Sequence, residues 1–234
     1  MNDFNNSCLN CNKRYSSLLN NLNNDELKIL NKNKYSISYK SGEIICKEGS
    51  KPMGLICLSK GKVKIVRRGV NGIEQIVGLK KAGNFIGIRA LMGGNSCLAS
   101  SVALEDSSVC IIKKSDFYKV IKNNESLAFK IMKVLALDLI KSDGRLVNLT
   151  QKHVRARLAE ALVLINDIYG TDQTTGSLNV VLKRSDLAQL SNMTTSNAIR
   201  ILSSFNKEDL IEVNHKSIKI NDLNVLKKIS AFDQ

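Results

Sequence analysis

Near residue 35 the chain changes from a polar pattern with helical spacing to short, strand-like runs. Residues 1–35 are polar and rich in Asn, with apolar residues recurring at helical spacing from Leu18 to Leu30. From Tyr35 to Ile112, runs rich in Val, Ile and Tyr alternate with glycines. Short strands broken so often by turns predict an antiparallel barrel or sandwich.

One hairpin can be read directly from this pattern. Two alternating runs, Lys62–Val66 and Ile73–Val77, flank the dipeptide Asn71-Gly72. Asn-Gly between alternating runs is a strong signal for a tight turn, because both residues tolerate left-handed backbone conformations. We therefore expect two adjacent strands joined by a turn.

Beyond Ser115 the apolar period becomes that of a helix, and the only proline, Pro52, lies well before this point. The pattern predicts a long helix over 124–150 and a second over 153–169. The long helix carries more large apolar groups than the edge of one barrel could cover, which favours a seam between two copies of the chain. The residues expected at this dimer interface are Leu127, Ile131, Leu135, Leu139 and Leu146.

Residues 184–203 have the spacing of a helix-turn-helix, with two short apolar-patterned segments on either side of Asn192. Asn suits the left-handed turn, and Thr194 is a good N-cap for the second helix. The start of that helix would suit the major groove of DNA, where Asn and Arg can pair with base edges. The residues expected to read bases are Thr195, Ser196, Asn197 and Arg200.

A small hairpin follows, because two short apolar runs, 210–213 and 217–220, flank the polar segment Asn214-His215-Lys216. This completes the pattern of a winged helix-turn-helix, with His215 and Lys216 at the tip to meet DNA phosphates. The chain has 234 residues and a net charge of +14, which favours a polyanionic partner. Most of that excess lies in residues 1–123, so charge alone does not locate the DNA site.

The order of these elements resembles the CRP/FNR family of transcription regulators, typified by the cyclic-AMP receptor protein and the fumarate and nitrate reduction regulator. Segments 71–78, 82–87 and 109–112 are similar to that family's β-roll. The resemblance implies an α+β fold with a jelly-roll-like antiparallel β-roll of the cyclic-nucleotide-binding-domain type in 1–123. A dimerisation helix in 124–150 and a winged helix-turn-helix in 151–234 would follow.

The same resemblance implies a homodimer that binds a palindromic promoter site in double-stranded DNA, with RNA polymerase as a further partner if the protein is an activator. It assigns base contacts to Thr195, Ser196 and Arg200. The positions that match its phosphate contacts are Lys183, Arg184, Thr194 and Lys216. Many members carry Glu where this chain has Ser196, whose hydroxyl discriminates less between bases, so the usual family operator does not carry over.

The chain departs from members that bind cyclic AMP. Those members carry a Gly-Glu pair and an Arg-Ser pair, because a carboxylate meets the ribose and a guanidinium meets the cyclic phosphate. The matching residues here are Gly87-Ile88 and Leu98-Ala99, which offer neither charge. Cyclic AMP is therefore not the expected effector. Arg89, one residue beyond Ile88, could still bind a different anion.

Of the six cysteines, only Cys8 and Cys11 have the spacing of metal ligands. Oxygen-sensing members of the family hold an iron–sulfur cluster with three N-terminal cysteines and one in a Val-Cys strand. Cys8, Cys11 and Cys110 match three of these positions, and Ser17 stands where another cysteine is expected. Four thiolates are needed for the usual cluster.

Three alternatives for the cysteines stay open. The first is an iron–sulfur cluster, for which Cys46 or Cys97 would have to supply the fourth ligand. The second is a Cys8–Cys11 pair that binds another metal or responds to redox state. The third is a Cys8–Cys11 pair with only a structural role. The leading expectation is that the protein has no cofactor. An iron–sulfur or thiol redox sensor of the same family is the alternative function.

Other classes of protein fit less well. His153 and His215 have no nucleophile motif around them, and the chain has no phosphate-binding loop of the Walker type, so we do not expect an enzyme. Charges interrupt every apolar run before it nears a membrane span, and the first twenty residues lack a signal-peptide pattern, which favours the cytoplasm. A ligand-binding dimer that no longer binds DNA is a further alternative, against which the basic Arg184, Arg200 and Lys216 argue.

Overall fold

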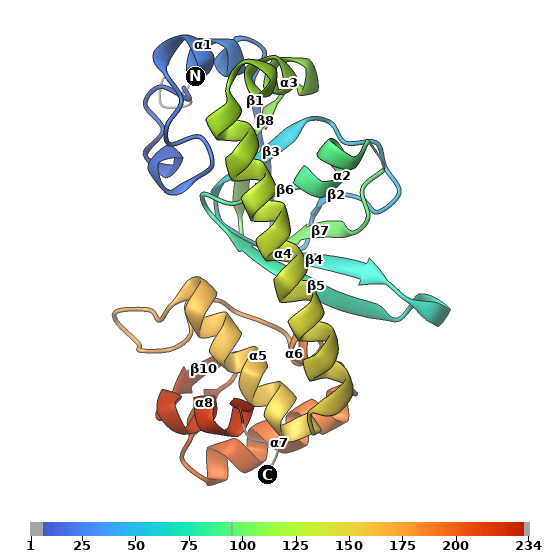
Figure 1. Cartoon of the computed structure of the whole chain (residues 1–234). Coiled ribbons are helices and arrows are strands. Elements are labelled where there is room, and N and C mark those ends of the chain that lie inside the picture. The colour runs from blue at the N-terminus through green and yellow to red at the C-terminus, as the bar shows by residue number, and fades with distance from the viewer. Residues whose placement is uncertain (1–6, 95, 232–234) are drawn as a thin grey trace. The chain divides into compact units, whose positions relative to one another are not determined.

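The computed structural model describes residues 7–94 and 96–231, and the chain divides into two compact units (Figure 1). The first unit contains Met1–Arg67 and Lys80–Ile140, and the second contains Arg68–Leu79 and Lys141–Gln234. In the described part of the chain, no helix is both long enough and apolar enough to span a bilayer.

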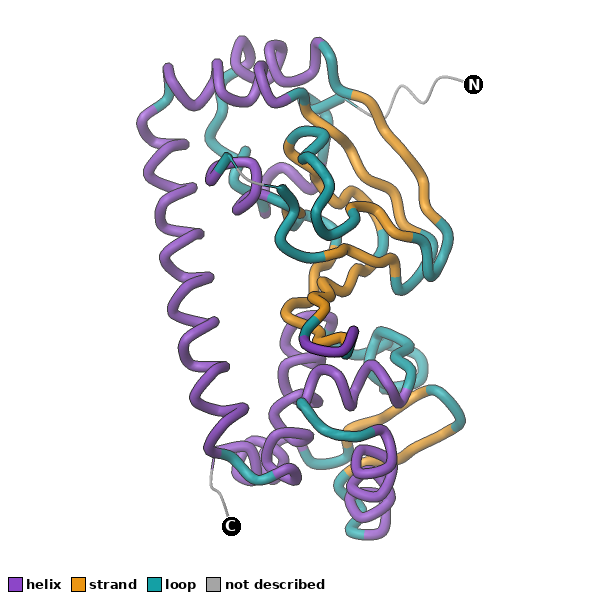
Figure 2. The backbone as a smooth tube through the Cα atoms, turned by 90° about the vertical axis from the view of Figure 1, so that its right-hand side faces the viewer, coloured by secondary structure: helices purple, strands orange, loops and turns teal. Residues whose placement is uncertain are grey.

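Residues 35–112 form two four-stranded sheets, and strands are orange in Figure 2. Most of these strands belong to the first unit, whereas most of the last strand of the second sheet belongs to the second unit. One sheet has the order β1-β8-β3-β6 and the other β2-β7-β4-β5, and neighbouring strands pair antiparallel. The strands are β1 (Tyr35–Tyr39), β2 (Ile44–Cys46), β3 (Leu55–Lys60), β4 (Lys62–Arg68), β5 (Glu74–Lys81), β6 (Phe85–Ile86), β7 (Ser100–Ala103) and β8 (Ser107–Ile112). The predicted antiparallel β-roll is confirmed.

The predicted hairpin is also confirmed. Strands β4 and β5 are joined through the short 3-10 turn Val70–Gly72. Within it, Asn71 has φ 58° and Gly72 has φ 73°. Both values lie in the left-handed region, which is the conformation that makes Asn-Gly a hairpin signal.

The helices around these sheets precede β1, lie between β6 and β7, or follow β8, and the last of them continues into the second unit. They are the 3-10 turn η1 (Asn12–Ser16), α1 (Asn24–Lys32), α2 (Ile88–Gly93), α3 (Lys114–Asn123) and α4 (Glu125–Gln151). Helix α1 begins at a capping box in which Asn23 and Glu26 exchange hydrogen bonds between side chain and backbone N–H, at 2.8 and 2.9 Å. The helix expected within residues 1–35 is therefore confirmed at its C-terminal end.

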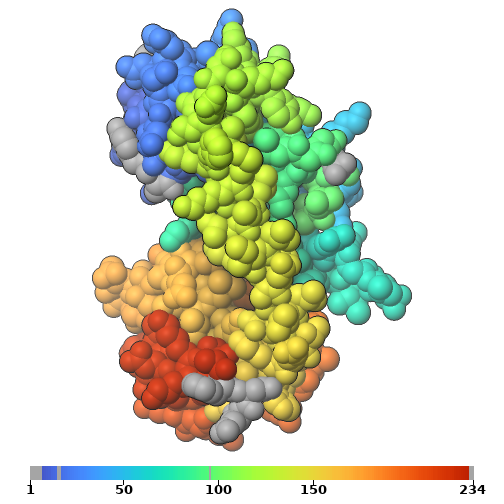
Figure 3. Space-filling view, viewed as in Figure 1, coloured from blue at the N-terminus to red at the C-terminus, as the bar shows by residue number. Residues whose placement is uncertain are grey.

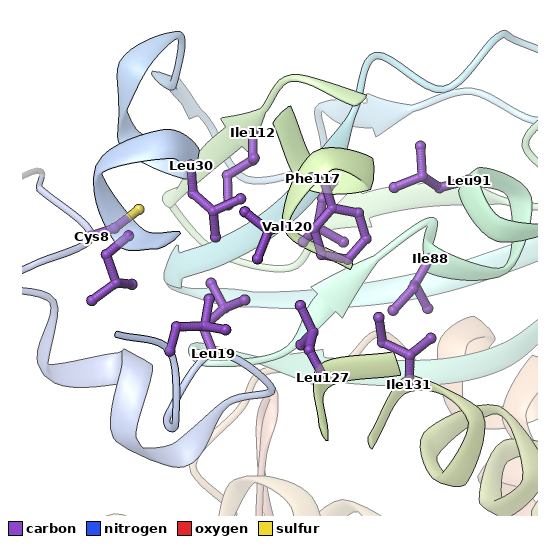
Figure 4. Packing of buried hydrophobic residues seen from close by; sticks show 13 residues of the cluster. Cys8, Leu19, Leu30, Ile88, Leu91, Ile112, Phe117, Val120, Leu127 and Ile131 are labelled. Atoms are coloured by element: carbon purple, nitrogen blue, oxygen red, sulfur yellow. The ribbon is translucent and has the colours of Figure 1, made fainter. Parts of the chain in front are cut away.

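The sheet β1-β8-β3-β6 is covered on both faces, because successive residues of a strand point to opposite sides. On one face, Ile56, Val109 and Ile111 pack against the other sheet inside the roll. On the other face, Leu55 and Ile112 join a cluster formed by the N-terminal segment and helices α1 to α4 (Figure 4). We call these the inner cluster and the outer cluster.

The outer cluster takes up the start of α4, and this corrects the predicted dimer interface. Leu127 and Ile131 are only 2% and 1% exposed within their own chain, so they cannot also contact a partner. Leu135 is partly buried against the same cluster. Assigning Leu127 and Ile131 to a dimer seam was wrong, because the outer cluster already buries that part of the stripe. Leu139 and Leu146 remain exposed.

The second unit is a helical domain with a small wing. Its elements after α4 are α5 (Val154–Tyr169), α6 (Arg184–Ser191), α7 (Thr195–Lys207), β9 (Ile211–Asn214), β10 (Ser217–Ile220) and α8 (Leu223–Ala231). Leu158, Leu162, Phe205 and Leu226 have no exposed surface and form its core. The predicted fold class, with a C-terminal winged helix-turn-helix after the long helix, is confirmed.

Two glycines provide a test of the tight packing around β8. A Cβ on Gly54 would lie 2.2 Å from the carbonyl oxygen of Ile112, whereas one on Gly42 would meet nothing within 4 Å. Both glycines have positive φ. We expect Gly42→Ala to cost ~1–2 kcal/mol and Gly54→Ala to cost at least ~2 kcal/mol more, because β3 and β8 must separate. Urea unfolding of the two variants measures the difference, and equal losses would contradict the packing of Gly54.

Candidate nucleic-acid interface

The turn between α6 and α7 is fixed by backbone conformation and by one arginine. Asn192 ends α6 with φ 50° and ψ 60°, the left-handed conformation expected for it. Arg157 Nη1 donates to the carbonyl oxygen of Asn192 at 3.0 Å. Thr194 then caps α7, because its hydroxyl accepts from the backbone N–H of Asn197 at 3.2 Å. The predicted turn and cap are both present.

Helix α7 has one buried face and one free face. Ala198, Ile201, Leu202 and Phe205 are buried in the unit's core. On the other side of the helix the side chains of Thr195, Ser196, Ile199, Arg200 and Ser203 are exposed. The predicted base readers Thr195, Ser196 and Arg200 therefore lie together on a solvent-facing surface, which we call the α7 face.

Asn197 is placed differently from the other predicted base readers. It is partly buried, and its side-chain Oδ1 accepts a hydrogen bond from Arg200 Nη2 at 3.4 Å. A bidentate contact with adenine needs both the oxygen and the amide nitrogen of Asn. In this arrangement the oxygen of Asn197 is engaged by Arg200, a contact that the spacing of three residues on a helix permits.

The candidate phosphate contacts lie at the N-terminal ends of α6 and α7 and at the tip of the wing. Lys183, Thr194, His215 and Lys216 are exposed. Arg184 is turned toward the wing, where its Nη2 donates to the carbonyl oxygen of His215 at 2.8 Å. His215 has φ 49°, so this contact holds the wing tip in a left-handed turn. Arg184 therefore acts on the position of the wing, in addition to any contact with phosphate.

A second arginine holds the far end of α7. The guanidinium of Arg155 lies 4.6 Å from the centre of the Phe205 ring and donates to Glu208 Oε1 at 2.9 Å. Hydrogen bonds from Arg155 and Ser204 lower the pKa of Glu208. Together with Arg157 at the turn, Arg155 fixes α7 against α5 at both ends.

The first unit contains a separate cavity of about 260 Å³ whose lining includes four thiols. Cys8 and Cys11 come from the N-terminal segment, while Cys57 on β3 and Cys110 on β8 lie directly opposite each other in register. Figure 4 shows Cys8 at the edge of the outer cluster. Cys57 was not among the predicted ligands.

Cys46 and Cys97 could supply a fourth ligand only if the fold brought one of them near the other thiols, and neither lines this cavity. Both belong to the inner cluster, on the opposite side of the sheet from this cavity. Burial and a hydrogen bond to Cys97 raise the pKa of Cys46 to about 12. The signal that could have pointed to Cys57 is its strand phase, because it alternates with the inward-facing Ile56 and Leu58.

A lysine and a serine lie next to one thiol of this cavity. Lys34 Nζ is 3.9 Å from the sulfur of Cys110, and the hydroxyl of Ser36 lies 3.5 Å from the same sulfur. Burial raises the pKa of Cys8 and, more strongly, that of Cys57, while the charge of Lys34 acts in the opposite direction. Across residues 7–94 and 96–231 no three Cys, His, Asp or Glu side chains are arranged to hold a metal ion.

Comparison with known proteins supports the same two-part organisation. Residues 36–124 match a family model described as cyclic nucleotide-binding domain, and residues 156–229 match one described as Crp-like helix-turn-helix domain. The chain belongs to the CRP/FNR family.

Relatives in this family include the cyclic AMP receptor protein of Thermus thermophilus, which is 24% identical over 82% of this chain and 86% of its own length. The fumarate and nitrate reduction regulatory protein of Escherichia coli is 22% identical over 81% of this chain and 76% of its own. The structure of FixK2 from Bradyrhizobium japonicum has a TM-score of 0.76 at 20% identity, covering 86% of this chain and 99% of that one. The chain is thus a transcription regulator with a DNA-binding helix-turn-helix.

The five predicted effector residues of this CRP/FNR regulator differ in burial, and one of them is charged. Gly87 precedes α2 with φ 75°, and Ile88 is buried in the outer cluster. Leu98 is 50% exposed, Ala99 is partly buried, and Arg89 is exposed. Arg89 is the only charged side chain among these five positions, and it faces solvent.

Proposed function

We propose that this CRP/FNR regulator acts as a homodimer on a palindromic promoter site and that cyclic AMP is not its effector. The observation that carries the proposal is the α7 face, where Thr195, Ser196 and Arg200 are exposed together on the second helix of the helix-turn-helix. In this class of motif that helix enters the major groove. If the protein activates transcription, RNA polymerase is a further partner.

Base reading and phosphate binding fall to different side chains. Arg200 lies in the second turn of α7, where a guanidinium can reach both O6 and N7 of guanine, and Asn197 orients it. Lys183, Thr194 and Lys216 are exposed and would serve as phosphate contacts. These exposed polar and basic groups also favour a DNA-binding protein over a ligand-binding dimer that has lost DNA binding.

The dimer would form along the exposed side of α4. Met132, Leu139 and Leu146 recur every seven residues and are 53%, 62% and 65% exposed. A seven-residue apolar repeat is the pattern of two helices packed along a shared seam. Figure 3 shows side chains of the α4 segment, in yellow-green, at the surface. Two bound copies would set their α7 helices about 34 Å apart, one turn of DNA.

A second candidate function is that of a metal or redox sensor, which the four-thiol cavity favours. Cys8, Cys11 and Cys110 would be joined by Cys57 in holding an iron–sulfur cluster, with Cys57 replacing the thiol missing at Ser17. The donor chemistry suits such a group, although the thiols are not yet arranged as ligands. The N-terminal segment would have to bring Cys8 and Cys11 closer to the sheet. A bound cluster would supply a centre that oxygen can oxidise.

The first prediction separates the two kinds of DNA contact. Arg200→Ala should cost ~1–3 kcal/mol on a selected operator and relax the preference at one base pair in each half-site. Lys216→Ala should weaken all duplexes alike and lower the salt slope by about one ion per protomer. Titrations of a selected and a scrambled duplex at several salt concentrations test this. Equal weakening of both duplexes by Arg200→Ala would make Arg200 a phosphate contact.

The second prediction concerns the dimer. Leu139→Asp should convert the protein to a monomer, because it would bury an unpaired charge in the seam. Lys141→Asp is the matched control, because it places the same charge about 200° around the helix. Sedimentation at micromolar concentration, with and without DNA, measures both variants. A wild-type monomer under both conditions would exclude the proposed dimer.

The third prediction is that cyclic AMP has no specific effect. Ile88 is buried in the outer cluster and Leu98 carries no charge, so ribose and phosphate find no charged partner at these positions. Calorimetry at millimolar nucleotide should give no saturable heat. Saturable binding tighter than roughly 100 micromolar would contradict this and would point to Arg89 as the phosphate ligand.

The fourth prediction tests the thiol cavity. Protein purified without oxygen should contain iron and acid-labile sulfide and absorb visible light, and Cys57→Ser should abolish these signals. Cys97→Ser is the control, because Cys97 is buried in the inner cluster and should leave them intact. A colourless, iron-free wild-type protein would reject the cluster, and an unchanged spectrum in Cys57→Ser would reject Cys57 as a ligand.

A further inference from the structure

Ile199 is the one large apolar side chain of α7 that the core does not take up. It is 47% exposed, whereas Ile201, Leu202 and Phe205 of the same helix are 6% exposed or less. Single apolar residues on a protein surface are common and need no explanation by themselves. Ile199, however, is exposed within the α7 face, among the residues proposed to contact DNA bases.

The neighbours of Ile199 on the helix surface are small and polar. Thr195 and Ser196 lie one turn before it and Ser203 one turn after it, and all three are exposed. Hydroxyl groups both donate and accept hydrogen bonds, so they discriminate weakly among bases. Arg200 prefers guanine. Ile199 is therefore the second side chain of the α7 face that can favour one base strongly.

The group that suits an isoleucine in the major groove is the C5 methyl of thymine. Each base pair presents a pattern of donors and acceptors there, and thymine adds an apolar methyl group. A β-branched side chain in a helix has one strongly preferred χ1 rotamer, so Ile199 would lose little freedom on contact. Bringing the two apolar groups together removes both from water.

We propose that Ile199 is a specificity-determining residue that reads a thymine through its C5 methyl group, in the same half-site as the base pair read by Arg200. This inference rests on the proposed DNA-binding function and goes beyond it in naming a base and the chemical group recognised. It predicts that an operator half-site requires a thymine whose contribution depends on its methyl group.

The experiment is a double-mutant cycle between protein and DNA. An operator is first selected from random duplexes with the full-length wild-type chain. Each thymine of the half-site is then replaced in turn by deoxyuridine, which keeps the hydrogen bonds and removes the methyl group. Binding is measured for the wild type and for Ile199→Ala, with circular dichroism to establish that the variant is folded.

One thymine should stand out in the wild type, with deoxyuridine weakening binding about fourfold per half-site, the effect of one buried methyl or methylene. Ile199→Ala should bind the unmodified operator more weakly by a similar factor and be insensitive to deoxyuridine at that position. Val181→Ala is the control, because it truncates another exposed apolar side chain, outside α7, and should keep the methyl dependence.

Two results would overturn the proposal. One is a selected half-site without thymine, and the other is a loss on deoxyuridine substitution that is the same in Ile199→Ala as in the wild type at every position. Failure of the wild-type chain to select any duplex would instead reject the DNA-binding function on which the inference rests. The two kinds of failure are therefore distinguishable.

Discussion

Covering the outer face of the sheet β1-β8-β3-β6 is the constraint that organises the first unit. Leu55 and Ile112 leave an apolar surface there, and the N-terminal segment, α1, α3 and the start of α4 bury it. Glu26 takes part twice, because it closes the capping box of α1 and accepts from the side chain of Asn124 at 2.7 Å. Asn124 in turn caps α4 by accepting from the backbone N–H of Leu127. The beginnings of α1 and α4 are thus joined by one carboxylate, and the outer cluster does not include the apolar residues of α4 beyond Leu135.

The second unit depends more on polar contacts at helix ends. Helix α7 buries only one of its sides, so burial fixes which side faces the core and leaves the position of its ends to other interactions. Arg157 holds the turn at Asn192, and Arg155 binds Glu208 at the other end. The contacts that position α7 therefore do not depend on the side chains of its exposed face. A helix positioned in this way can present different side chains to solvent without losing its place in the fold.

The fold could be predicted from the sequence because its signals are local: the Asn-Gly turn, the change to a helical period, and the cap at Thr194. The contacts between elements could not be predicted in this way, because they depend on how segments distant in the sequence pack against one another. The period of α4 showed an apolar stripe, but it did not show that Leu127 and Ile131 serve the chain's own core. Cys57 was missed for the same reason, since its proximity to Cys110 comes from strand register. Asn197 had the right type and spacing for base contact, yet its side-chain oxygen accepts a hydrogen bond from Arg200.

The strict alternation along β3 has a consequence for how this regulator can diverge. Ile56 and Leu58 hold the roll together from the inside, while Cys57, between them, belongs to the cavity outside. A substitution at Cys57 therefore alters the chemistry of the cavity without changing the volume packed between the sheets. Descendants of one ancestral protein could lose or gain a thiol there through single mutations, each step passing through a folded regulator, so that the stimulus changes while the architecture is inherited intact.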